Sequence, residues 1–184
     1  MAFKFKRLGI PDVVLIESEI HADERGFFTE ICKASEFEEN KVPCRFVQSN
    51  YSRSGKNVLR GLHYQAEPEA QGKLVRVVHG RIFDVAADLR RNSGSFARWV
   101  SAELSEENGR MLWVPEGFAH GFLALEEDTR VLYQCTREYS KAHERGIIWN
   151  DPSIKVAWPI KDPILSEKDR ALPRLSSAGL NDDA

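Results

Sequence analysis

The stretch KLVRVVHGRIFDVAADL, residues 73–89, is the clearest indication of the fold in this sequence. Two runs rich in apolar residues lie on either side of Gly80, which is the pattern of two strands joined at a tight turn. Because side chains alternate across a strand, every second residue from Lys73 to His79 lies on the same face. Such a face mixes charged with apolar groups. It is expected either on the inner wall of a polar cleft or on an exposed sheet surface.

The rest of the chain repeats this pattern at short intervals. Further apolar runs bounded by turn residues are VVLIESEI (13–20), CRFVQSNYS (44–52), VLRGLHYQ (58–65), FARWVSAELS (96–105), RMLWVP (110–115), GFLALEE (121–127), TRVLYQCTREY (129–139), GIIWND (146–151) and IKVAWP (154–159). Helical patterning is confined to KASEFEENK (33–41) and SEKDRALPRL (166–175). Roughly ten short strands with short turns predict an all-β fold, an antiparallel sandwich or barrel with a few short peripheral helices.

The composition indicates one globular domain. The 184 residues are 42% hydrophobic and 29% charged, which suits a single domain with a sizeable core. We expect that domain to span residues 1–175 and the small, polar residues 176–184 to form a flexible tail. A formal net charge of -2 argues against a protein that coats nucleic acid. The N-terminal residues MAFKFKRLGI contain no long apolar run, so neither a signal peptide nor a membrane span is expected.

The cysteines indicate the redox state of the compartment in which the protein is expected. Cys32, Cys44 and Cys135 are widely separated, and an odd number without close pairs argues against a disulfide framework. The expectation is therefore a reducing compartment and a cytoplasmic location.

Positive charge is concentrated between Tyr51 and Phe83, where six basic residues face two acidic ones. A local positive field inside a nearly neutral protein suits a small anion better than a polymer. Long cations that decorate exposed strand faces would give the same pattern.

The histidines do not form a metal-binding pattern. Metal-binding barrels usually present two close histidines, but the position two residues after His63 is Gln65, and His120 lies far along the chain. The sequence also lacks HExxH and CxxC spacings. We therefore do not expect a metal.

A metal-free reaction at a carbon next to a ketone needs three groups. Histidine is the usual base near neutral pH, a lysine or arginine can hold the enolate, and a tyrosine hydroxyl can return the proton from the opposite face. A carboxylate can orient the histidine. For these parts the chain offers His63, Lys73, Tyr133 or Tyr139, and Asp84 or Asp169.

Six phrases in a fixed order then point to one family. They are DERGFFTE (23–30), FVQSNYSRSGKNVLRGLHYQ (46–65), GKLVRVVHGRIFDVAADLR (72–90), WVPEGFAHGF (113–122), IIWNDP (147–152) and LSEKD (165–169). Together they resemble the dTDP-4-dehydrorhamnose 3,5-epimerase family over nearly the whole chain. The resemblance implies a cupin-like jelly roll, a homodimer, no metal or organic cofactor, and a dTDP-sugar substrate. The implied reaction inverts C3 and C5 of dTDP-4-keto-6-deoxyglucose on the route to dTDP-rhamnose.

The resemblance also implies roles for individual residues. It assigns the base to His63 paired with Asp169, enolate stabilisation to Lys73, and the acid to Tyr133. It assigns binding of the nucleotide sugar to Arg25, Glu30, Gln48, Asn50, Arg60, His120, Tyr139, Glu144 and Lys168, with Arg25 and Arg60 at the diphosphate. Arg60 and His63 are three residues apart and would lie on opposite faces of a regular strand, so we expect a bulge or kink at Gly61.

The N-terminal segment bears on the expected dimer. Residues 3–19 form a strand-rich arm with few turn signals, and a partner's sheet would satisfy its edge. Arg25 follows this arm and is then placed to reach the partner's pocket.

Three other interpretations stay open. The first is an epimerase or isomerase that acts on another dTDP-sugar, at C3 alone or C5 alone. The second is a metal-dependent cupin oxygenase or isomerase. The third is a jelly roll that binds sugars without catalysis.

Overall fold

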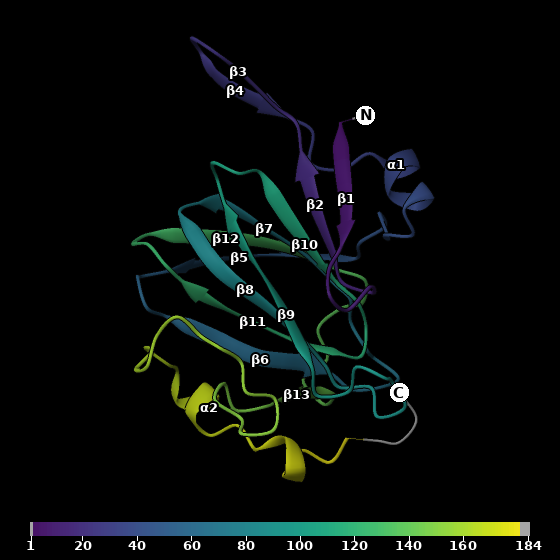
Figure 1. Cartoon of the computed structure of the whole chain (residues 1–184), viewed down its shortest axis with the longest axis vertical. Helices are drawn as coiled ribbons and strands as arrows, with labels where there is room; N and C mark the ends of the chain where they lie inside the picture. The colour runs from purple at the N-terminus through teal and green to yellow at the C-terminus, as the bar shows by residue number, and fades with distance from the viewer. Residues whose placement is uncertain (1, 181–184) are drawn as a thin grey trace.

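Residues 2–180 are described in a computed structural model, in which two antiparallel β-sheets pack face to face (Figure 1). The six-stranded sheet has the order β1 (Phe3–Arg7), β2 (Val14–Ser18), β10 (Arg110–Val114), β7 (Lys73–His79), β12 (Thr129–Cys135) and β5 (Gln48–Ser54). The five-stranded sheet has the order β13 (Glu144–Gly146), β6 (Leu59–Gln65), β11 (Phe118–Ala124), β8 (Arg81–Asp88) and β9 (Trp99–Ser105). This cupin-like sandwich confirms the predicted all-β class.

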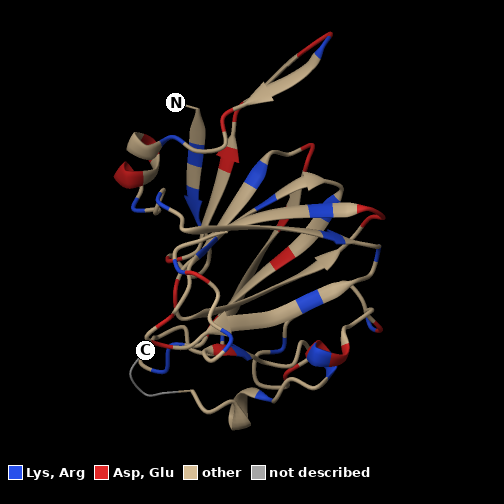
Figure 2. Ribbon diagram, turned by 180° about the vertical axis from the view of Figure 1, so that it is seen from behind, with Lys and Arg blue, Asp and Glu red and all other residues tan. Residues whose placement is uncertain are grey.

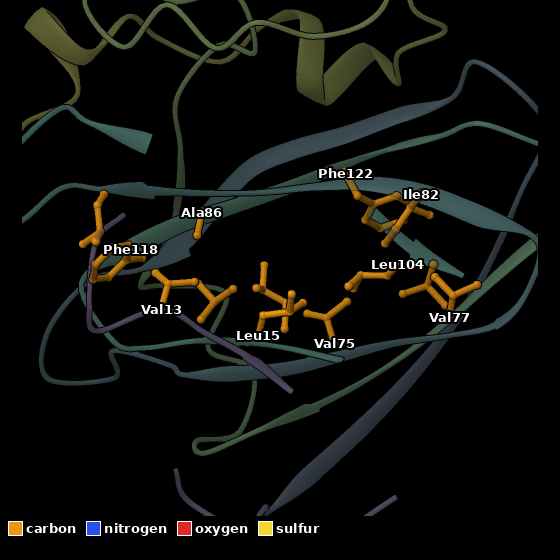
Figure 3. Packing of buried hydrophobic residues seen from close by; sticks show 13 residues of the cluster. Val13, Leu15, Val75, Val77, Ile82, Ala86, Leu104, Phe118 and Phe122 are labelled. Atoms are coloured by element: carbon orange, nitrogen blue, oxygen red, sulfur yellow. The ribbon is translucent and has the colours of Figure 1, made fainter. Parts of the chain in front are cut away.

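The main hydrophobic core lies between the sheets (Figure 3). As the alternation predicts, Val75 and Val77 of β7 face inward and pack in one cluster with Ile82 and Ala86 of β8. Gly80 joins the two strands with φ +76°, a conformation that favours glycine. Because β7 and β8 belong to different sheets, this turn carries the chain from one layer to the other.

Two further clusters cover the outer faces of the sheets. The C-terminal segment, with α2 (Glu167–Arg170) and the 3₁₀ turn η1 (Leu175–Ser177), lies along the five-stranded sheet beside β6 (Figure 1). On the six-stranded sheet, α1 (Ala34–Glu39) buries Phe37 against Phe3 at 5.2 Å between ring centres.

Two predicted strands are not strands in the structure. Residues 147–160 form an irregular segment whose apolar side chains pack on the five-stranded sheet. Buried Asp151 accepts hydrogen bonds from the backbone N–H groups of Ser153, Ile154 and Leu175, which replaces sheet pairing. Burial of apolar residues on an outer face therefore gives the same sequence pattern as a strand.

Residues 22–26, ADERG, form the end of a hairpin. Its strands β3 (Ile20–Asp23) and β4 (Gly26–Thr29) project away from the sandwich (Figure 1). Phe27 and Phe28 in this hairpin are 53% and 66% exposed.

The expectation about cysteines is wrong for one pair. Cys32 and Cys44 form a disulfide, whereas Cys135 is free and buried. Because α1 folds back on the sheet, the chain segments before and after it meet there. The disulfide removes the sequence argument for a reducing compartment.

Within residues 2–180, no helix has the length and apolar character needed to cross a membrane. The predicted flexible tail begins inside η1, and its last residues, 181–184, lie outside the described residues.

Candidate active site

A solvent-accessible cavity of about 290 Å³ opens between the sheets. Its walls are Ser52, Arg60, His63, Lys73, His120, Phe122, Tyr133, Ser166, Lys168 and Asp169. A second hollow, also about 290 Å³, shares His63, Lys73 and Tyr133 with it. Its other walls are Gln48, Asn50, Tyr64, Gln65, Gln71, Tyr139 and Glu144. The two hollows form one cleft with His63, Lys73 and Tyr133 at the junction.

A kink in β6 turns two functional candidates to the same side. Arg60 pairs with Phe122 and His63 pairs with His120, so two residues of β6 stand opposite one residue of β11. Gly61 adopts φ +133° at this bulge. The prediction of a kink at Gly61 is therefore confirmed, and Arg60 and His63 both line the cavity.

His63 forms a hydrogen-bonded pair with a residue from a distant part of the chain. Its Nε2 lies 2.5 Å from Oδ1 of Asp169, which is 4% exposed. Ser166 caps α2: its hydroxyl accepts from the Asp169 backbone N–H at 3.0 Å and donates to Asp169 Oδ2 at 2.9 Å. Burial alone would raise the pKa of Asp169, but its hydrogen bonds with His63 and Ser166 lower that pKa below its ordinary value. The carboxylate therefore stays ionised and holds the imidazole.

Lys73 and Tyr133 face His63 from the opposite sheet. The Lys73 ammonium donates one long hydrogen bond, 3.5 Å, to the His63 carbonyl oxygen, and burial lowers the pKa of Lys73. Burial raises the pKa of Tyr133, so its hydroxyl stays protonated near neutral pH. The cleft thus combines an oriented imidazole, an amine and a phenol.

A second histidine–carboxylate pair lies deeper in the same cavity. His120 Nε2 is 2.7 Å from Oδ1 of Asp84, and Asp84 is completely buried. Asp84, which the sequence offered as an alternative partner for His63, is thus bonded to His120.

Hydrogen bonds connect the polar residues of the second hollow. Lys168 donates to Glu144, and the Tyr139 hydroxyl donates to the same carboxylate at 2.8 Å. Gln48 accepts from the Tyr139 backbone N–H at 2.7 Å and donates to Asn50 at 2.8 Å. This network fixes five of the residues that the sequence assigned to substrate binding.

The remaining assigned residues separate into two groups. Arg60 lines the cavity and is held by Ser54 Oγ at 3.0 Å and by the Arg53 carbonyl at 3.1 Å. Arg25 lies at the tip of the β3–β4 hairpin, where its guanidinium bonds to Asp23 at 2.5 Å. Glu30 follows that hairpin and is exposed, and neither residue lines the cleft of its own chain. Figure 2 shows the charged tip of this hairpin far from the body of the sandwich.

Three wall residues of the first hollow were not selected from the sequence, although signals for them exist. Ser52 is two residues after Asn50, and Phe122 is two residues after His120, so alternation puts each on the same strand face as a selected residue. Ser166 precedes a carboxylate by three positions, which is the pattern of a capping box.

The polar side chains that line the cleft are hydrogen-bonding and cationic groups. Among residues 2–180, no group of three or more His, Cys, Asp or Glu side chains is arranged to hold a metal ion. The arrangement can abstract a proton with His63, hold negative charge with Lys73, and supply a proton from Tyr133.

Comparisons with known proteins identify the family of this chain. The sequence model of the family described as dTDP-4-dehydrorhamnose 3,5-epimerase matches residues 7–177. An enzyme of that name from Shigella flexneri is 54% identical over 163 residues, which cover 87% of this chain and 89% of the relative. The crystal structure of an epimerase from Legionella pneumophila, in complex with dTDP-4-keto-L-rhamnose, is 44% identical with a TM-score of 0.91 and covers 95% of this chain and 94% of that one. A 3'-monoepimerase from Streptomyces bikiniensis, in complex with dTDP-quinovose, is 31% identical with a TM-score of 0.87 and covers 93% and 87%.

Proposed function

This chain belongs to the dTDP-4-dehydrorhamnose 3,5-epimerase family, and we propose that it inverts C3 and C5 of dTDP-4-keto-6-deoxy-D-glucose to give dTDP-4-keto-L-rhamnose. The proposal follows from the convergence of the His63–Asp169 pair, Lys73 and Tyr133 on one cleft. These are the groups that a metal-free inversion next to a ketone requires.

In the proposed reaction, His63 removes the proton from the carbon next to the C4 ketone. The electron pair of the broken C–H bond moves onto the ketone oxygen, and the Lys73 ammonium stabilises that enolate. Asp169 orients the imidazole and stabilises the imidazolium that forms. Tyr133 then delivers its proton to the opposite face of the carbon. His63 releases the proton it gained to solvent and Tyr133 takes one up from solvent, and the same sequence at the second carbon completes the reaction.

Protonation states support this division of roles. The pKa of Tyr133 is raised by burial, so the phenol holds its proton until the enolate accepts it. The pKa of Asp169 is lowered, chiefly by its bond to His63 against the effect of burial, so it remains an anion while the imidazole gains a proton.

The diphosphate and the nucleoside of the substrate are proposed to bind to the other residues of the cleft. A diphosphate suits Arg60, His120 and Lys168, because each offers donors at the cavity wall. The nucleoside suits the second hollow, where Tyr139 provides an aromatic face and Gln48, Asn50 and Glu144 provide hydrogen-bonding groups.

A homodimer is part of the proposal. The β3–β4 hairpin exposes Phe27 and Phe28 and carries Arg25 at its tip. An isolated two-stranded hairpin is marginally stable, and exposed aromatic residues favour burial against another surface. We propose that the hairpin docks on a second copy and brings Arg25 and Glu30 to the partner's cleft.

A second candidate is epimerisation at one carbon only. The similarity to a 3'-monoepimerase favours keeping it, because such an enzyme needs the same base, enolate stabiliser and acid. The location in the cytoplasm stays a prediction from the sequence.

One assay tests the reaction and separates the two candidates. The protein is incubated with dTDP-4-keto-6-deoxy-D-glucose in heavy water, and deuterium is located in the product by NMR. The expected result is deuterium at both C3 and C5 with the L-rhamno configuration. Deuterium and inversion at one carbon would favour the second candidate, and binding without deuterium uptake would contradict both.

A further inference from the structure

We propose that Asp84 is a positioning residue of this cleft, whose carboxylate orients His120 and serves as the buried counterion of Lys73. Within residues 2–180, Asp84 lies outside the hydrogen-bond network around Glu144. The catalytic consequence of the proposal rests on the proposed function, whereas the electrostatic interaction between Asp84 and Lys73 can be tested in the ligand-free protein.

Asp84 occupies a position where an unpaired charge is strongly disfavoured. It lies on the inner face of β8, between Ile82 and Ala86 of the main core, and it is completely buried. An ionised carboxylate in such surroundings is retained only where hydrogen bonds and opposite charge compensate for lost hydration. Asp84 therefore requires partners inside the cavity.

Only one of its two oxygens has a hydrogen-bond partner within residues 2–180. Oδ1 is 2.7 Å from Nε2 of His120, whereas Oδ2 is buried without any hydrogen bond. The bond to Oδ1 fixes the ring of His120, which lines the cavity. It leaves the other ring nitrogen, Nδ1, for a ligand. The unbonded oxygen leaves negative charge that nearby cations can neutralise.

Lys73 is a cation whose charge is poorly compensated by hydrogen bonds. Among residues 2–180 its ammonium has a single hydrogen-bond partner, the His63 carbonyl oxygen, at the long distance of 3.5 Å. Burial lowers the pKa of Lys73, and three acidic groups oppose that effect, namely Cys135, Asp84 and Glu144. Burial raises the pKa of the Cys135 thiol, so that residue is uncharged near neutral pH. Glu144 is already engaged by Lys168 and Tyr139, which leaves Asp84 as the principal anion for Lys73.

Other titratable or charged groups face the same space from every neighbouring element. They are Arg60 and His63 on β6, His120 on β11, Tyr133 and Cys135 on β12, Tyr139 after β12, Glu144 on β13, and Lys168 and Asp169 on α2. Within this set Asp169 is committed to His63, so it does not serve Lys73.

The consequence for catalysis follows from the charge of Lys73. A neutral amine donates a weaker hydrogen bond to an enolate oxygen than an ammonium does. Asp84 would thus extend the range of pH over which Lys73 stabilises the enolate, without contacting the substrate.

The test measures the titration of Lys73 directly. In protein labelled with ¹³C at lysine Cε, the Lys73 signal is assigned by its loss in Lys73→Arg, and its titration midpoint is compared between wild type and Asp84→Asn. Asparagine keeps the size of the side chain and its ability to bond to His120. We expect the midpoint to fall by one pH unit or more, and an unchanged midpoint would overturn the proposal.

Three further variants separate charge from a general disturbance of the cavity. Ser52→Ala removes a buried hydroxyl without changing charge and is expected to leave the Lys73 midpoint unchanged. Glu144→Gln is expected to lower it by less than Asp84→Asn does. His120→Gln keeps the Asp84 charge, so the midpoint is not expected to fall. A fall as large as in Asp84→Asn would assign the effect to the imidazole and overturn the counterion role. His120→Gln also serves if Asp84→Asn does not fold.

Kinetics then distinguish this proposal from the function on which it rests. With Asp84→Asn, the alkaline limb of kcat is expected to move to lower pH by the same amount as the midpoint. In a Lys73→Arg background, the same substitution is expected to leave that limb in place. A shifted midpoint with an unshifted kcat limb would uphold the counterion and contradict the role of Lys73 in the reaction.

Discussion

Gly61 and Gly121 approach so closely that a Cβ atom on Gly61 would stand 2.5 Å from the Cα atom of Gly121. This contact between β6 and β11 lies at the bulge that turns Arg60 and His63 into the cleft. Gly61→Ala combines this clash with an unfavourable φ of +133°, so we expect it to lower the free energy of unfolding by about 3 kcal/mol. Urea denaturation measures the change.

Gly94→Ala is the matched control for that experiment. A Cβ at Gly94 would meet no atom of the described residues within 4 Å, so the unfolding midpoint of this variant should stay near that of the wild type. Equal effects of the two substitutions would show that the close approach at Gly61 is not a constraint on the fold.

His63→Asn is expected to reduce kcat by roughly 10²- to 10⁴-fold or more, because it removes the group that accepts the proton. Circular dichroism should show an unchanged fold. His79→Asn provides a control, since His79 is exposed on the surface and pairs with Glu106 outside the cleft. Near-wild-type turnover in His63→Asn would remove this residue as the base.

Tyr133→Phe is expected to separate proton exchange from inversion. The substitution removes one hydroxyl and almost no volume, so His63 can still remove a proton and return it to the same face. In heavy water, deuterium exchange should persist while the inverted sugar falls sharply. A parallel loss of exchange and inversion would argue for Tyr139 or a water molecule as the donor.

Complementation between two defective variants is expected to reveal the proposed sharing of sites. In a heterodimer of Arg25→Ala and His63→Asn, one cleft combines an intact His63 with the partner's intact Arg25. Co-expressed protein should regain about a quarter of wild-type activity, because half of the dimers are mixed and each has one intact site. No gain over the separate variants would place Arg25 outside the partner's cleft.

Asp88→Asn tests a stabilising network away from the cleft. Burial alone would raise the pKa of Asp88, but hydrogen bonds from Arg90, Ser95 and Ser93 lower it to about 2. A carboxyl with a lowered folded pKa adds stability that is fully present above its unfolded pKa, near 3.8, and is lost as pH falls through about 2. Near neutral pH the variant should lose about 2 kcal/mol of unfolding free energy.

The loss of unfolding free energy in Asp88→Asn should become smaller as the pH falls from about 5 to about 2, because Asp88 of the wild type is protonated over the range set by its unfolded and folded pKa values. Asp12→Asn is the control, because Asp12 bonds to the same Arg90 at 3.2 Å but is half-exposed, so its effect should be small. A loss in Asp88→Asn that does not depend on pH would contradict the electrostatic explanation.

The strands of the two sheets could be predicted because local pattern determines them. In β7 and β8, alternation places Val75, Val77, Ile82 and Ala86 on the faces that the core buries. The same logic fails for residues 147–160, whose apolar side chains are also buried but whose backbone bonds to the carboxylate of Asp151. A sequence pattern indicates which side chains are buried. It does not indicate whether the backbone N–H and C=O groups form hydrogen bonds with a neighbouring strand or with a side chain.

The cleft was predictable only in part, for a related reason. The bond between His63 and Asp169 joins residues 106 positions apart, and only the family's motifs connected them in advance. The kink at Gly61 could be predicted, because two functional residues three positions apart cannot share a face of a regular strand. The pairing of Asp84 with His120 depends on which strands become neighbours, and no local signal specifies that.

The position of α2 has a consequence for how the protein becomes active during synthesis. Both sheets are encoded before Ser166, and domains tend to fold from the N-terminal side as the chain emerges. A nascent chain that already contains every strand of the sandwich still lacks Asp169, and its His63 has no carboxylate to hold it. The enzyme would therefore gain its oriented base among the last events of translation. A message truncated just upstream of codon 166 would then yield a nearly complete but catalytically impaired sandwich.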